Sequence, residues 1–238
     1  MNYKEVSRGL SETEAEKYSL GITLMGNFAD DLRKQGILPK RFKQPEVFGK
    51  ALTFTDETRR ALLNDGAVIY LPTGETIKSQ RDAKRPFAYL PGGFKVNGRN
   101  RLTEFPSRAI EVAIYPDPER FFAPDTFNKD TDRQTVLIEQ DADSLRKRLG
   151  LENITEILPE ASEATEVIFR YFDKTAVRLL GRDYMRDGHW SYIRTATPTN
   201  KEGSFVAYVG CWSDGIGLHV YDWFRAMRVM SVLGPPVG

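Results

Sequence analysis

The C-terminal third of the chain alternates between apolar and polar positions, a pattern that predicts antiparallel strands. Asp214 and Gly215 separate two alternating runs, and an Asp-Gly pair in this setting is typical of a two-residue type I′ hairpin. Pairing Ser213 with Ile216 across this turn determines the register of both strands. That register places three further pairs opposite each other: Gly210 with His219, Val209 with Val220, and Tyr208 with Tyr221.

Opposed residues share a face of a sheet, so this register divides the hairpin into an apolar face and an aromatic face. We expect the apolar face to pack into the core. It holds Val209, Cys211, Ile216, Leu218 and Val220. The aromatic face holds Val206, Tyr208, Trp212, His219, Tyr221 and Trp223.

A third strand is predicted at residues 189–195, and a loop at residues 197–203 joins it to the hairpin. The length of this loop leaves the register of the third strand open. If Ile193 lies on the apolar face, alternation places the neighbouring positions on the other one. Three residues then join the aromatic face: Trp190, Tyr192 and Arg194.

The aromatic face is our candidate ligand-binding site. Its rings offer stacking surfaces, Arg194 and His219 offer directed hydrogen-bond donors, and a ligand can approach the backbone closely at Gly210 and Gly217. The residues predicted to bind a ligand are Tyr192, Arg194, Tyr208, Trp212, His219 and Tyr221. Aromatic residues also line sheets that a helix covers, so the sequence leaves a buried packing role open as well.

Helical periodicity and turn signals predict the elements in the rest of the chain. A capping box at residues 11–14 opens a helix and makes residues 1–50 a helical subregion. The basic stretch at residues 78–101, with its Asn97-Gly98 pair, is expected to form exposed loops. The other predicted elements are helices from Thr55 to Asn64, from Thr131 to Gly150 and from Pro159 to Gly181, strands at 67–71 and 110–115, and a last short helix capped by Asp222.

Strands and helices that are segregated along the chain favour an α+β fold over alternating βαβ units. We therefore predict a largely antiparallel or mixed sheet, with a C-terminal three-stranded meander and about four packing helices. The length of 238 residues allows a single domain, residues 1–238. A composition of 40% hydrophobic and 28% charged residues is ordinary for a soluble globular protein.

The cellular location is predicted from what the sequence lacks. No apolar run approaches the roughly 18 residues that a membrane-spanning helix needs. The first residues show no apolar stretch typical of a secretory signal, and the single cysteine fits a reducing compartment. We expect a cytoplasmic protein that does not associate with a membrane.

Charge is distributed unevenly along the chain. Residues 33–108 hold 16 Lys and Arg against 7 Asp and Glu, a net charge of +9, whereas residues 109–173 hold 7 against 15, a net charge of −8. The two segments can pair within one chain, or between two copies in a homo-oligomer. Because the whole chain carries a net charge of only +1, self-complementarity is favoured over nucleic-acid binding.

The catalytic signatures considered are weak. Cys211 and His219 flank the same turn, but the register places them on opposite faces, which argues against a cysteine nucleophile activated by histidine. No His-x-x-x-His, paired Cys or Gly-x-Ser-x-Gly element is present, so neither a metal nor a cofactor is predicted. No motif identifies a family.

Three hypotheses follow. The first is non-catalytic binding of a small molecule or protein partner, or assembly, through the aromatic face. The second is a hydrolase or transferase in which His219 is the general base and Arg194 stabilises an anionic group. The third, and weakest, is binding of anions or nucleic acid by the basic loops at residues 78–101.

Overall fold

The computed structural model describes residues 51–127, 129, 131–185, 192–201, 205–213, 217–223 and 232–235. At residues 131, 132, 211–213, 217, 221–223 and 232 it describes the backbone alone. The chain divides into two units, Met1–Pro45 and Glu46–Gly238, and the described residues belong to the second. The helix and helical subregion predicted within residues 1–50 therefore lie outside the described residues.

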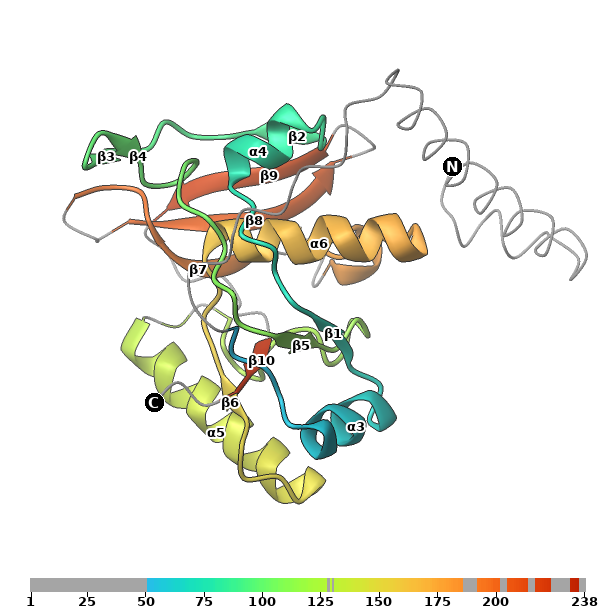
Figure 1. Ribbon diagram of the computed structural model, residues 1–238. Coiled ribbons are helices and arrows are strands. Elements are labelled where there is room, and N and C mark those ends of the chain that lie inside the picture. Colours follow the sequence, from blue (N-terminus) through green and yellow to red (C-terminus); the bar gives the residue numbers. More distant parts are fainter. Residues whose placement is uncertain are drawn as a thin grey trace, which may run out of the picture. The chain divides into compact units, whose positions relative to one another are not determined.

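The C-terminal sheet has four strands in the order β2-β9-β8-β7 (Figure 1). Strands β7 (Tyr192–Pro198), β8 (Val206–Ser213) and β9 (Gly217–Trp223) form an antiparallel meander. The short strand β2 (Phe87–Tyr89) adds to β9 in parallel orientation. The C-terminal meander predicted from the sequence is confirmed, with one further strand at its edge.

The register of the meander agrees with the prediction except at the turn. Gly210 pairs with His219, and Tyr208 pairs with Tyr221. Ser213, however, pairs with Gly217 after an irregularity in β8, and not with Ile216. The two-residue turn predicted at Asp214-Gly215 is therefore wrong in length, because three residues separate the paired ends; those three lie outside the described residues.

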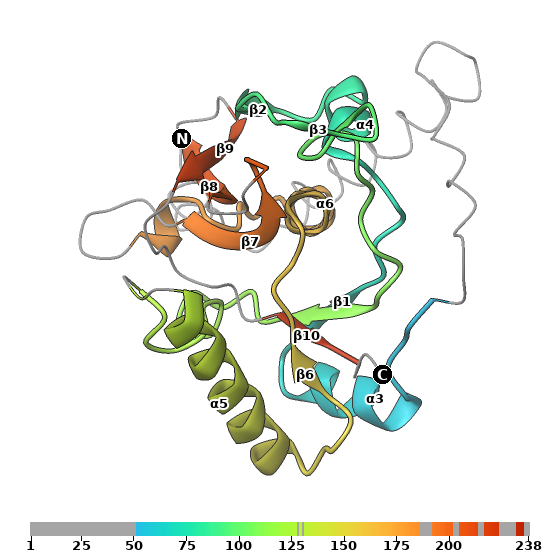
Figure 2. The same cartoon turned by 90° about the vertical axis from the view of Figure 1, so that its left-hand side faces the viewer.

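One face of the C-terminal sheet packs on helix α6 (Ala161–Thr175), as Figure 2 shows in a view along the helix. Sheet residues and helix residues form one core cluster, in which the sheet contributes Ile193, Ala207, Val209, Leu218 and Val220, all fully buried. These are apolar residues at alternating strand positions, as the sequence predicts. Helix α6 ends earlier than expected, because Ala176 adopts a left-handed conformation with φ 58° and its amide donates to Phe172 O.

Both edge strands of the C-terminal sheet have features that limit pairing with a further strand. The three residues of β2 lie between Pro86 and Pro91. On the opposite edge, the amide of Ala196 in β7 donates to Pro159 O at 2.8 Å, just before α6.

A second sheet has the order β1-β5-β10-β6. Its strands are β1 (Val68–Tyr70), β5 (Val112–Ile114), β10 (Val232–Gly234) and β6 (Thr155–Glu156). Strands β1 and β5 confirm the two predicted here, whereas β6 and β10 were not predicted from the sequence. Asp222 does not cap a helix, since it pairs with Ala207 within the C-terminal sheet.

Two predicted helices accompany the second sheet. Helix α3 (Asp56–Asn64) begins after Thr55, whose hydroxyl accepts from the Thr58 amide, so the predicted N-cap is confirmed. Helix α5 (Thr131–Leu149) buries Ile138, Ala142 and Leu145 at helical spacing. Each helix begins where the sequence predicts.

The basic stretch that was expected to form exposed loops contains regular structure. Helix α4 (Ile77–Asp82) is opened by a reciprocal capping box between Thr76 and Ser79. Strands β3 (Lys95–Val96) and β4 (Arg99–Asn100) form a hairpin. Asn97 and Gly98 join them with φ values of 50° and 78°, the two positive values that a type I′ turn requires.

The described part of the chain has an α+β fold with four α-helices and antiparallel and mixed sheets, as predicted. None of the described helices is long and apolar enough to span a bilayer.

Candidate functional site

A row of paired residues crosses the C-terminal sheet on the face away from α6. Tyr192 pairs with Gly210, Gly210 pairs with His219, and His219 pairs with Tyr89. We call these four residues the open row. Neighbouring strands are about 4.8 Å apart, so the backbones of Tyr192 and His219 lie about 10 Å apart, with only a glycine between them. The register thus places Gly210, which has no side chain and is itself buried, between two residues that carry rings.

The side chains of the open row reach solvent to different degrees. Tyr192 and His219 are partly exposed, and Tyr89 is 45% exposed. Burial lowers the pKa of His219, so the neutral imidazole is favoured near pH 7. The row therefore combines stacking surfaces with neutral hydrogen-bonding groups.

Tyr89 is the member of the row that sequence reasoning missed. Phe87 pairs with Leu218 on the core face and contacts Phe169 of α6 edge-on, with ring centroids 5.1 Å apart. An irregularity between Phe87 and Tyr89 then aligns Tyr89 with His219. Because β2 joins the sheet over a long sequence separation and in parallel, no local pattern could place it there.

A second row, which we call the closed row, lies beside the open one. It pairs Arg194 with Tyr208, and Tyr208 is only 2% exposed. Gln134 of α5 accepts a hydrogen bond from Arg194 Nη1 at 2.9 Å and donates from Nε2 to Thr126 O at 2.9 Å. The first turn of α5 thus lies against Arg194. For this row, the covered-sheet interpretation of the aromatic face applies.

The predicted ligand-binding residues are therefore divided. Tyr192, Arg194, Tyr208 and His219 share one face of the sheet, as the predicted register requires. The side chains of Trp212 and Tyr221 lie outside what the structure describes, as does that of Cys211, and so do His189 and Trp190. Gln134, which contacts this face, gave no sequence signal, because a glutamine in the first turn of a helix is ordinary.

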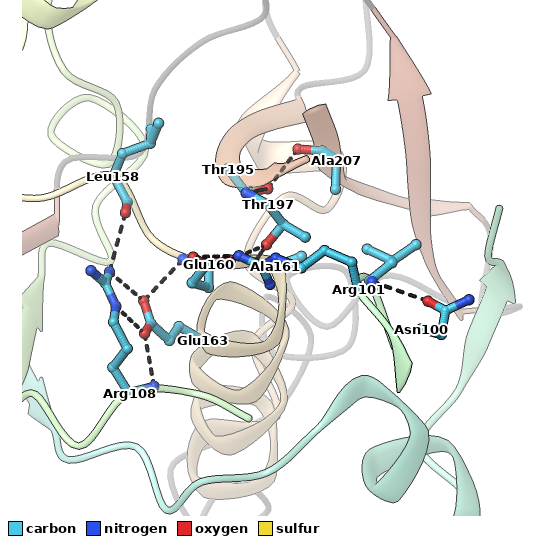
Figure 3. A network of polar contacts seen from close by, with 11 residues as sticks. Asn100, Arg101, Arg108, Leu158, Glu160, Ala161, Glu163, Thr195, Thr197 and Ala207 are labelled. Carbon is cyan, nitrogen blue, oxygen red and sulfur yellow. Dashed lines mark hydrogen bonds and ion pairs between the residues drawn. The ribbon is translucent and has the colours of Figure 1, made fainter. Parts of the chain in front are cut away.

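The opposite charges of the two chain segments meet along α6. Glu160, Glu163 and Glu166 recur every three residues, and we call them the glutamate stripe. Figure 3 shows the first two, Glu160 and Glu163, with their partners. Arg101 donates from Nη2 to both carboxylate oxygens of Glu160, each at 2.9 Å. Thr197 of β7 also donates to the Glu160 carboxylate.

Glu163, 3% exposed, occupies the next position of the stripe. Arg108 donates to it from Nε at 2.6 Å and from Nη2 at 2.8 Å. The backbone amides of Arg108 and Glu160 donate to the same carboxylate. Each oxygen of this buried carboxylate is therefore bonded more than once.

Glu166, 1% exposed, closes the stripe and binds two chain segments at once. It accepts from the amide and hydroxyl of Thr73 at 2.7 and 2.9 Å and from the Ser107 hydroxyl at 2.6 Å. Nearby, the carboxylate of Glu75 forms no hydrogen bond or ion pair with any residue that the structure describes. Burial and the charge of Glu166 raise the pKa of Glu75.

Internal ion pairs engage part of the basic segment. Besides the glutamate stripe, Arg85 pairs with Asp173 and Lys78 pairs with Glu104. Within the part of the chain that the structure describes, four exposed cations of residues 78–101 form no ion pair: Arg81, Lys84, Lys95 and Arg99, the last of which donates to the backbone O of Glu104. Contacts within one copy thus account for part of the uneven charge along the chain.

Among the described residues, no group of three or more His, Cys, Asp or Glu side chains is arranged to hold a metal ion. Comparison with known proteins finds no match: no family model, no curated protein and no solved structure matches this chain.

Proposed function

We propose that the C-terminal sheet binds a flat ring, of a small ligand or of a partner's side chain, without a catalytic centre. The observation that supports this is the register of the open row, which leaves a glycine between Tyr192 and His219 and aligns the exposed Tyr89 with them. A flat group over Gly210 can contact backbone and ring faces together.

The remaining predicted residues take supporting roles in this proposal. Tyr208 is buried, so it maintains the floor of the face and does not touch the ligand. Arg194 borders the open row. Trp212 and Tyr221, whose side chains lie outside the described residues, stay predicted contacts.

The test of this proposal places a side chain at Gly210. We expect Gly210→Val to abolish binding of flat ring compounds, such as indole-3-carboxamide, measured by NMR chemical-shift titration. Tyr192→Ala should weaken the same binding, and Leu63→Ala, an exposed residue of α3, serves as the control. Thermal unfolding verifies that each variant is folded. Failure of every flat compound to bind the wild type, or binding that survives Gly210→Val, would overturn the proposal.

Catalysis on the same face is the second candidate, in which a hydrolase or transferase uses His219 as general base and Arg194 to stabilise an anion. The lowered pKa of His219 favours it, because a general base must be unprotonated at working pH. Hydrolysis of activated esters that His219→Gln abolishes, and that rises with pH through the His219 pKa, is the expected result. Equal rates for wild type and His219→Gln would eliminate this candidate.

A further inference from the structure

We infer that the carboxyl groups of Asp141 and Glu156 share one proton, and that this shared proton makes the attachment of helix α5 to strand β6 sensitive to pH. The inference is independent of the proposed function and concerns the second sheet. It draws on three features of the described residues: the positions of the two acids, the hydrogen bond between their side chains, and the charges around them.

The first step is the position of the pair. Asp141 is partly exposed and lies on α5 next to the buried Ala142. Glu156 lies in β6 and is only 9% exposed. Helix α5 packs beside β6 (Figure 2). The two acids therefore meet from different elements, in a place that water reaches only in part.

The second step is the hydrogen bond. The side chains of Asp141 and Glu156 are hydrogen-bonded to each other. An ionised carboxylate can only accept hydrogen bonds, so one of two bonded carboxyl groups must carry a proton. Such a proton belongs to the pair and not to either residue alone. The contact between α5 and β6 thus includes one proton that both acids hold.

The third step is charge. Burial raises the pKa of Asp141 above its ordinary value of 3.8, although the bond with Glu156 and the charge of Arg148 act to lower it. Arg148 is also engaged elsewhere, since it donates to both carboxylate oxygens of Asp65. Once the pair loses its proton, two negative charges repel each other in a partly buried place. The stabilising contribution of the pair is therefore full below pH 3.8 and is lost as the pH rises through the folded-state pKa.

The fourth step compares this contact with two other polar contacts of α5. Near the start of the helix, Gln134 accepts a hydrogen bond from Arg194, and neither group is a carboxyl. At its end, Arg148 binds Asp65. Burial acts to raise the pKa of Asp65, but hydrogen bonds, that from Arg148 foremost, hold it well below its ordinary range. Of these three contacts, only the one with the shared proton has a carboxyl group whose pKa is raised.

The first experiment follows both carboxyl groups by carbon-13 NMR as the pH is raised. We expect the Asp141 and Glu156 resonances to move together in two steps, the second above the ordinary pKa of a carboxyl group. Asp141→Asn should leave Glu156 with a single step. Glu139→Gln, at an exposed position of the same helix, is the matched control and should leave both steps unchanged. If each group instead titrates alone, in one step within the ordinary range, the inference is wrong.

The second experiment measures hydrogen exchange of the α5 amides at pH 4 and pH 8, corrected for the intrinsic exchange rate. We expect the opening of α5 to increase with pH, by about tenfold for each unit that separates the second NMR step from the ordinary pKa. Asp141→Asn and Glu156→Gln should each remove this increase, because an amide donates to the remaining carboxylate without titrating.

Two variants keep this second experiment decisive if one of them fails to fold, which thermal unfolding verifies. An increase that persists in the folded variants, as it should in Glu139→Gln, would show that the pair does not control the attachment of α5. Opening of the wild type that stays constant with pH would have the same meaning.

Discussion

The glutamate stripe of α6 and the open row of the C-terminal sheet are two polar regions with opposite properties. The stripe is charged, mostly buried, and bonded to Arg101, Arg108, Thr73 and Ser107. In the open row the neutral form of His219 is favoured near pH 7, and the ring residues are at least partly exposed, whereas the glycine between them is buried. Strong charge in the described residues therefore belongs to the architecture of the protein, whereas the proposed ligand-binding face combines ring side chains with a glycine.

Among substitutions in the glutamate stripe and its partners, Glu166→Ala should have the largest effect on the free energy of unfolding. The change leaves the Thr73 amide, the Thr73 hydroxyl and the Ser107 hydroxyl without their acceptor in a buried place. We expect the free energy of unfolding to fall by about 3 to 5 kcal/mol in urea denaturation. Glu139→Ala, an exposed acid on α5, should change it by less than about 0.5 kcal/mol, and equal effects of the two would contradict the buried role of Glu166.

Arg108→Met should have the next largest effect. It removes the guanidinium from Glu163, which keeps two backbone donors but stays buried, so we expect a loss of about 2 kcal/mol. The exposure of Arg108 reduces this loss relative to that of Glu166→Ala. Arg60→Met on α3, an exposed arginine without an ion pair, is the control for urea denaturation. If the free energy of unfolding falls no more for Arg108→Met than for Arg60→Met, the Arg108–Glu163 pair contributes no more than a surface ion pair.

Glu75→Gln should stabilise the protein slightly, by about 0.5 kcal/mol at pH 7. The pKa of Glu75 is raised above its ordinary value of 4.5 by burial and by Glu166, so its contribution to stability is full below that value. This contribution is lost as the pH rises through the folded-state pKa. In urea denaturation between pH 4 and pH 8, the free energy of unfolding should decline less with rising pH for Glu75→Gln than for the wild type. Parallel declines for the two proteins would contradict a raised pKa of Glu75.

The smallest effect is expected from the basic residues that remain outside ion pairs. Because the net charge of the chain is +1, we expect the protein to pass a heparin column at physiological ionic strength without retention. Retention that the combined substitution of Arg81, Lys84, Lys95 and Arg99 by Gln abolishes would instead favour the anion-binding hypothesis for the basic residues 78–101.

The parts of the fold that follow local rules could be predicted from the sequence. Thr55 caps α3 because its hydroxyl accepts a hydrogen bond from the amide of Thr58, three residues along the chain. Tyr208 opposes Tyr221 because side-chain alternation and hairpin pairing depend on nearby residues. The hairpin at Asn97-Gly98 also follows a local rule, since an Asn-Gly pair favours a type I′ turn. Its strands have only two residues each, however, and produce no alternating pattern.

The parts that depend on distant segments could not be predicted. Tyr89 reaches the open row through a parallel pairing with β9. Gln134, which lies on α5, reaches Arg194 of β7. The glutamate stripe was missed because acids on an amphipathic helix ordinarily face solvent. Only the opposite net charges of the two segments pointed to it, and they did not identify the partners.

The edges of the C-terminal sheet determine how this protein can meet another chain. An unpaired strand edge is a template for edge-to-edge growth and aggregation. Here β2 is three residues long between Pro86 and Pro91, and a proline cannot donate to a new strand. At β7, the amide of Ala196 is occupied by Pro159 O. The short, proline-flanked β2 and the occupied amide of β7 thus discourage extension of the sheet at both of its edges.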